Sequence, residues 1–126
     1  MFVKQFRYPY FEEVLELPAG KRNSTLENPL ECGKRELKEE TGATAQNFIF
    51  LGELYPSPGY CGEIIWLYAA TNLSFGESCP DDNEFLEVIK IPLEKSVSMV
   101  LSGEIKDAKT QTAILKLKTL KSIGKI

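Results

Sequence analysis

The chain has 126 residues, a length that suits one domain over residues 1–126, and 43% of them are hydrophobic, which is enough to form a core. The net charge is −3 and there is no long basic run, which argues against a surface that binds nucleic acid. No apolar run approaches the roughly 18 residues that a membrane-spanning helix requires. We therefore expect neither nucleic acid nor a membrane as a partner.

Histidine is absent, which excludes Ser–His and Cys–His nucleophiles as well as histidine-bound metals. The three cysteines, Cys32, Cys61 and Cys79, are odd in number and form no C-x-x-C pair. This usage argues against a disulfide framework or a zinc site and predicts a reduced, cytoplasmic chain. Acid–base chemistry must then depend on carboxylates, lysines, tyrosines or water bound to a metal.

The first third of the chain predicts two strands followed by a helix. Residues 2–7 alternate apolar and polar side chains, as a half-buried strand does. Residues 13–17 form a second strand, which ends at the Pro-Ala-Gly turn of residues 18–20. The helix should begin at residues 28–29, where Asn can act as the N-cap and Pro suits the first helical position, and Gly42 should end it.

The remaining sequence alternates strand-like and helix-like segments. Strands are expected at residues 47–55, 63–70 and 85–91, a polar loop at 72–83, and helices at 93–101 and 107–123. The last helix carries an apolar stripe of Ala113, Ile114, Leu117 and Leu120. Strands in the middle of the chain, flanked by helices, predict an α/β sandwich.

The first helix concentrates three carboxylates, Glu36, Glu39 and Glu40, on neighbouring positions of one face, with Cβ atoms about 5–6 Å apart. At about 5 Å and an effective dielectric of about 20, one like-charge pair costs roughly 3 kcal/mol. A charged, solvent-facing helix would explain this composition. The alternative is a site for a hard divalent cation, because Mg²⁺ prefers oxygen ligands from a few carboxylates and substrate phosphates.

The wider pattern favours the cation site. Glu27 is followed after seven residues by Arg-Glu-Leu-Lys-Glu-Glu-Thr-Gly at 35–42, a spacing that resembles the signature of the Nudix hydrolases. There are two departures. Six residues rather than five separate Gly20 from Glu27, and Ala43 stands where a larger aliphatic residue is usual.

The resemblance implies a Nudix-type α/β/α sandwich with a mixed sheet between helices. It also implies attack of water on a diphosphate, assisted by two or three Mg²⁺ ions, with Mn²⁺ as a substitute. By correspondence with the family, Glu36 and Glu40 would be the main metal ligands and Glu39 would lie beside them as a further ligand or a partner of one. The backbone carbonyl of Ala19 would complete the coordination of one ion.

Other residues acquire roles through the same resemblance. Arg35 and Glu27 would pair and orient the preceding loop on the helix, although a plain surface ion pair is the alternative. Arg7 would bind a substrate phosphate, although an arginine at the edge of a strand in contact with water is the alternative. A loop before the penultimate strand would bring one more acidic residue to the metals, with Glu84 favoured over Asp82 because Asp82 is shorter by a methylene.

Further segments are similar to the ADP-ribose pyrophosphatase-like branch of the family. They are residues 3–9, 15–21, 55–59, 81–88 and 103–110. Members of that branch usually carry some tens of residues before the first of these segments, which form a subdomain exchanged within a dimer. This chain starts almost at that segment, so we expect either a truncated protein or a short one with a poorer base site, and a homodimer stays open.

The sequence therefore predicts a Mg²⁺-dependent pyrophosphohydrolase for ADP-ribose or a related nucleoside diphosphate sugar. Two alternatives remain. One is a nucleoside triphosphate or dinucleotide as substrate of the same metal site, and the other is a catalytically weak Nudix-fold module that binds nucleotides.

Overall fold

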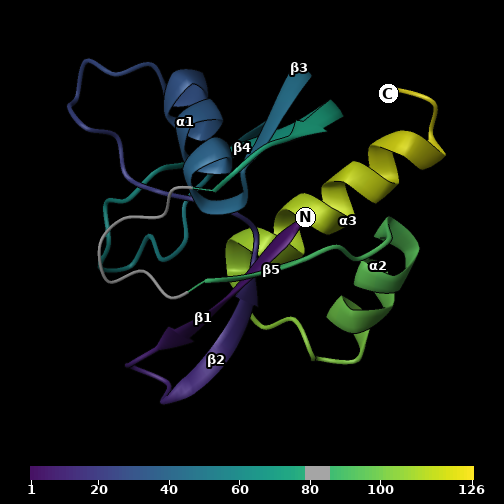
Figure 1. Cartoon of the computed structure of the whole chain (residues 1–126). Coiled ribbons are helices and arrows are strands. Elements are labelled where there is room, and N and C mark those ends of the chain that lie inside the picture. The colour runs from purple at the N-terminus through teal and green to yellow at the C-terminus, as the bar shows by residue number, and fades with distance from the viewer. Residues whose placement is uncertain (79–85) are drawn as a thin grey trace.

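The computed structural model describes residues 1–78 and 86–126 (Figure 1). Its elements are β1 (Phe2–Arg7), β2 (Glu12–Glu16), α1 (Pro29–Thr41), β3 (Ala43–Leu54), β4 (Ile65–Phe75), β5 (Glu87–Ile89), α2 (Leu93–Leu101) and α3 (Ala108–Ser122). None of the helices in these two ranges has the length and apolar character that a membrane crossing requires.

The strands form two sheets. The first has the order β2-β1-β5, with Val3 of β1 opposite both Glu16 of β2 and Val88 of β5. The second is the β3–β4 hairpin, which runs from the pair Ala43–Phe75 to the pair Leu54–Ile65. All strand pairs in the described residues are antiparallel. The predicted α/β class is confirmed, but the expected mixed pairing is not formed in this part of the chain, because β1–β2 and β3–β4 are each joined as hairpins.

Helices cover both faces of the β3–β4 pair. On one face α1 packs against β3 and β4, and Gly33 of α1 lies nearest to the ring of Tyr68. On the other face Leu51, Leu67 and Ala69 form a buried cluster with Ala113 of α3. Figure 1 shows α3 running between the β3–β4 pair and α2. The layers are therefore those of an α/β/α sandwich.

A second buried cluster joins the β2-β1-β5 sheet to the two C-terminal helices. It contains Phe2 of β1, Val100 of α2, Ile114 of α3 and Ile105, which is fully buried between those helices. Partly buried Leu17 packs against both clusters. The residue that follows β2 is thus held by the whole core.

Most predicted elements occur at their expected positions, with three differences. β3 begins at Ala43 rather than residue 47, and β4 continues to Phe75 through the first residues of the segment expected to be a polar loop. Residues 73–75 pair with residues 43–45, so backbone pairing overrides the polar composition there. β5 has only three residues in the described part of the chain.

Candidate active site

The helix that carries the three predicted carboxylates is defined at both ends by its sequence. The side chain of Asn28 accepts a hydrogen bond of 2.8 Å from the amide of Leu30, and Pro29 occupies the first turn. Gly42 ends α1 in the left-handed conformation at φ 70°. A Cβ at Gly42 would overlap the carbonyl of Gly76, so the end of β4 also approaches this glycine closely. The helix is thereby fixed to the second sheet.

The Pro-Ala-Gly turn at residues 18–20 lies directly on the acidic face of α1. The amide of Ala19 donates a hydrogen bond of 3.1 Å to Oε2 of Glu40. A Cβ at Gly20 would overlap the carboxyl group of Glu36, so only glycine leaves room for that carboxylate. The structure therefore brings Ala19, Glu36 and Glu40 together, and Glu40 is buried although it is acidic.

Arg35 lies among the carboxylates and offsets their mutual repulsion. Its Nη1 is 2.7 Å from Oε1 of Glu36 and 3.1 Å from Oε2 of Glu39, and its Nε is 3.2 Å from Oε1 of Glu27. The hydrogen bond to Glu27 is the main cause that raises the pKa of Arg35 above its usual range. Arg35 thus links the helix face to the loop before it, with Glu27 in the position predicted.

The loop between the turn and α1 is organised by Glu27. Its Oε2 accepts a hydrogen bond of 2.6 Å from the amide of Asn23, and the hydrogen bonds from Arg35 and from this amide lower the pKa of Glu27. Arg22 stacks over the ring of Trp66 of β4 at 4.8 Å from its centroid. The loop, one residue longer than the family pattern, is therefore attached both to α1 and to the second sheet.

Arg7, predicted to bind a phosphate, is at the end of β1 and forms a bidentate pair with Glu16. Its Nε is 2.7 Å from Oε2 and its Nη2 is 3.0 Å from Oε1 of that carboxylate. This hydrogen bonding is the main cause that raises the pKa of Arg7, and the charge of Glu40 adds to it. The Arg7 side chain is 44% exposed, so part of it still faces solvent.

Sequence reasoning missed Glu16 and Lys109. Glu16 is buried and lies 2.6 Å from Nζ of Lys109 in α3. Burial raises the pKa of Glu16, but the hydrogen bonds from Arg7 and Lys109 outweigh it and lower the pKa overall. The only signal in the sequence is a glutamate between the apolar residues Leu15 and Leu17, and nothing there identifies a partner 93 residues away.

The oxygen atoms that the site offers are of the kind that a hard divalent cation prefers. Glu36 and Glu40 supply carboxylate oxygens next to the Ala19–Gly20 backbone, and Mg²⁺ typically takes one or two protein carboxylates together with waters and substrate phosphates. Within residues 1–78 and 86–126, no group of three or more His, Cys, Asp or Glu side chains is arranged to hold a metal. Asp82 and Glu84 lie outside the described residues.

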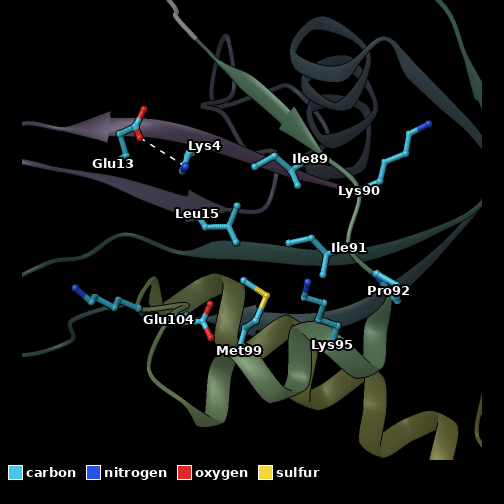
Figure 2. A pocket seen from close by; sticks show the side chains of 11 residues that line it. Lys4, Glu13, Leu15, Ile89, Lys90, Ile91, Pro92, Lys95, Met99 and Glu104 are labelled. Carbon is cyan, nitrogen blue, oxygen red and sulfur yellow. Dashed lines mark ion pairs between the residues drawn. The ribbon is translucent and has the colours of Figure 1, made fainter.

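Grooves on the described surface include two of similar size. One of about 610 Å³ runs between α1 and β3, where it borders Arg35, Glu39 and Phe48. The other, of about 570 Å³, lies between β2, the segment after β5, and α2, and Figure 2 shows Lys95 extending into it from α2. None of the described residues that line this second groove belongs to the predicted site. The groove along α1 shares Arg35 and Glu39 with the predicted site, whereas Glu36, Glu40 and the Ala19–Gly20 turn do not line it.

Comparison with known proteins gives several similar sequences. The chain is 41% identical over 116 residues to the ADP-ribose pyrophosphatase of Bacillus subtilis (strain 168). The matched region covers 90% of this chain and 62% of that protein. It is 35% identical over 116 residues to the methanol dehydrogenase activator of Bacillus methanolicus, with the same coverage of 90% and 62%. It is 34% identical over 119 residues to the GDP-mannose pyrophosphatase of Yersinia enterocolitica, covering 87% of this chain and 61% of that protein. The chain thus spans less than two thirds of the length of these relatives.

The fold has a close counterpart among solved structures. The crystal structure of an ADP compounds hydrolase superposes with a TM-score of 0.83 over 99% of this chain and 68% of that chain, at 21% sequence identity. At this identity the likeness shows the shared fold. A family model described as the NUDIX domain matches residues 1–111, which include the turn, the acidic helix and both sheets. The resemblance predicted from the spacing between Glu27 and Gly42 is confirmed, and the chain belongs to the NUDIX domain family.

Proposed function

We propose that this protein is a Mg²⁺-dependent pyrophosphohydrolase that cleaves the diphosphate of ADP-ribose or of a related nucleoside diphosphate sugar. The observation that carries the proposal is the contact between the Ala19–Gly20 turn and the carboxylates of Glu36 and Glu40. It places the backbone of the turn beside the carboxylate oxygens of a distant helix. Such oxygens suit Mg²⁺ or Mn²⁺ and the phosphates that accompany them.

Several residues of the site would bind the metal ions. Glu36, Glu40 and the carbonyl of Ala19 would hold two or three metal ions, with Glu39 beside them and Glu84 or Asp82 as a further acidic group. When bound, these ions supply positive charge for the diphosphate and lower the pKa of a water molecule.

The remaining contacts orient these groups. The Ala19 amide fixes the direction of the Glu40 carboxylate. Arg35 holds Glu36 and Glu39 together against their repulsion and joins them through Glu27 to the preceding loop. The exposed part of the Arg7 side chain would contact a substrate phosphate while Glu16 fixes the direction of the guanidinium. Ordering these side chains before substrate arrives is what makes such electrostatic stabilisation effective.

The substrate class rests on the relatives. Two of the similar proteins are named as pyrophosphatases, one of ADP-ribose and one of GDP-mannose, and both names describe a nucleoside diphosphate linked to a sugar. We extend this class to the present chain. We further propose a small-molecule substrate rather than nucleic acid, a cytoplasmic location and a homodimer. The charge of −3 agrees with the first, and three cysteines without a C-x-x-C pair agree with the second.

A substrate panel tests the proposal. ADP-ribose, GDP-mannose, a nucleoside triphosphate and a dinucleoside polyphosphate would each be incubated with the protein and Mg²⁺, and phosphate would be measured after coupling to a phosphatase. We expect the highest kcat/KM with ADP-ribose or GDP-mannose. A preference for the triphosphate or the dinucleotide would support the first alternative. Nucleotide binding by calorimetry without turnover would support the binding module.

A further inference from the structure

The start of α3 is attached to the end of β2 through one buried hydroxyl group. Thr110 is fully buried, and its Oγ1 accepts a hydrogen bond of 2.9 Å from the amide of Leu17. The same hydroxyl donates a hydrogen bond of 2.7 Å to Oδ2 of Asp107, the N-cap residue of α3. Because the Thr110 hydroxyl donates its hydrogen bond to Asp107, a lone pair of its oxygen is available to accept from the Leu17 amide.

The residue before Leu17 is attached to the same helix. Glu16 accepts hydrogen bonds from Lys109 of α3 at 2.6 Å and from Arg7 of β1 at 2.7 Å. Lys109 also lies 3.0 Å from Oδ2 of Asp107. Two consecutive residues of the chain are thus held by the first turn of α3, one through its side chain and one through its backbone.

These attachments lie immediately before the turn that meets the acidic helix. Pro18 restricts its own φ and the conformation of the residue before it, so the path from Leu17 to Ala19 has little freedom. Two residues after the Thr110 contact, the Ala19 amide reaches Glu40 at 3.1 Å, and Gly20 follows against Glu36. A shift of Leu17 would therefore move the turn relative to both carboxylates.

We propose that Thr110, oriented by Asp107, is a positioning residue that holds the Ala19–Gly20 turn in register with Glu36 and Glu40. This inference deepens the proposed function, because it assigns to α3 the alignment of the two halves of the metal site. In this assignment Thr110 acts on Glu36 and Glu40 only indirectly, through its hydrogen bond to the Leu17 backbone.

Thr110→Val tests the assignment, since it keeps the shape of the side chain and removes the hydroxyl. Thr110→Ser restores the hydroxyl. Ser96→Ala is the matched control. Ser96 is almost as buried as Thr110, and among the described residues its hydroxyl donates only to the Leu93 carbonyl within α2. Three readouts apply to the protein without substrate: the Mn²⁺ dissociation constant from the electron paramagnetic resonance of free Mn²⁺, amide hydrogen exchange at residues 17–20, and the melting temperature.

We expect Thr110→Val to weaken Mn²⁺ binding roughly tenfold, the lower end of the effect of residues that support metal ligands. Amide exchange at Ala19 and Gly20 should accelerate in parallel. Thr110→Ser should behave like the parent protein, and Ser96→Ala should lower the melting temperature without changing metal affinity. Asp107→Asn retains an oxygen that can cap α3. It should weaken Mn²⁺ binding and accelerate amide exchange at residues 17–20, both to a smaller extent than Thr110→Val. This variant replaces Thr110→Val in the test if Thr110→Val does not fold.

The inference is overturned if Thr110→Val lowers the melting temperature but leaves Mn²⁺ affinity and the exchange at residues 17–20 unchanged. It is also overturned if Ser96→Ala weakens Mn²⁺ binding as much as Thr110→Val does. Failure of the parent protein to bind Mn²⁺ would contradict the proposed function instead. In that case amide exchange alone decides whether Thr110 holds the turn.

Discussion

The backbone of Gly20 lies against the carboxyl group of Glu36 with no room between them for a methyl group. Gly20→Ala should therefore displace either the turn or the carboxylate, and a misplacement of about 1 Å in such a site costs on the order of 10²-fold in rate. We expect kcat/KM to fall by about that factor. Gly62→Ala is the control, because a Cβ there meets nothing within 4 Å. Equal activity of the two variants would contradict the importance of this contact.

Glu40→Gln keeps the volume of the side chain and an oxygen for the Ala19 amide but removes the charge. If Glu40 is a metal ligand, turnover should fall by a factor of about 10² or more while the protein stays folded. The measurement is kcat at saturating Mg²⁺, with circular dichroism for the fold. Glu31→Gln is the control on the same helix, since Glu31 is exposed and pairs only with Lys34 among the described residues. Turnover like that of the parent protein would refute the assignment.

Glu84 and Asp82 lie outside the described residues. A comparison of two variants decides which of them is the further acidic group of the site. A carboxylate that acts only once the metals and the diphosphate are in place should affect turnover more than substrate binding. Glu84→Gln should therefore lower kcat more than it raises KM, and Asp82→Asn should do less. A larger loss for Asp82→Asn would reverse the choice, and no loss in either would direct attention to Glu53 or Glu63.

The buried Glu16 should make stability depend on pH in the acid range. Its pKa in the folded protein lies below the ordinary value of 4.5, so its stabilisation is complete above about that pH and is lost as the pH falls through the lower, folded-state pKa. Glu16→Gln should lower the free energy of unfolding at pH 7 by roughly 1–3 kcal/mol, moderated by the exposure of Arg7. Urea denaturation between pH 3 and pH 7 measures both effects.

The variant should also flatten the pH dependence below about pH 4.5, because the titrating group is gone. Glu13→Gln, at an exposed position of the same strand, is the control and should preserve the acid-side slope of the parent protein. A parent protein whose stability stays constant down to pH 3 would show that the Arg7–Glu16–Lys109 contacts do not contribute in this way.

The residues of the candidate site and their local contacts could be predicted from the sequence. The contacts that join the site to distant parts of the chain could not. The bounds of α1 are predicted by Asn28, Pro29 and Gly42, and the pairing of Glu27 with Arg35 is predicted by their spacing. These signals are short-range and act through backbone preferences. The contacts of Thr110 with Leu17 span 93 residues, and a threonine at the start of a helix gives no indication of such a partner.

The strand limits show the same division. β4 continues past Asn72, which adopts a positive φ of 56°, because residues 73–75 find partners at the start of β3. A polar segment with Asn and Ser predicts a loop on composition alone, and only the register of the hairpin reveals the pairing. For the same reason the sequence does not predict a strand at Ala43, Thr44 and Ala45, since none of them belongs to an apolar run.

Two neighbouring residues of α3, Ala113 and Ile114, are buried in different clusters, one under the β3–β4 hairpin and one under the β2-β1-β5 sheet. The helix is thus apolar on two sides, and in the described residues each sheet shares a buried cluster with it. Unfolding of either sheet would expose one side of α3 to water and remove support from the other. The two sheets should consequently melt together, as a single cooperative transition in calorimetry.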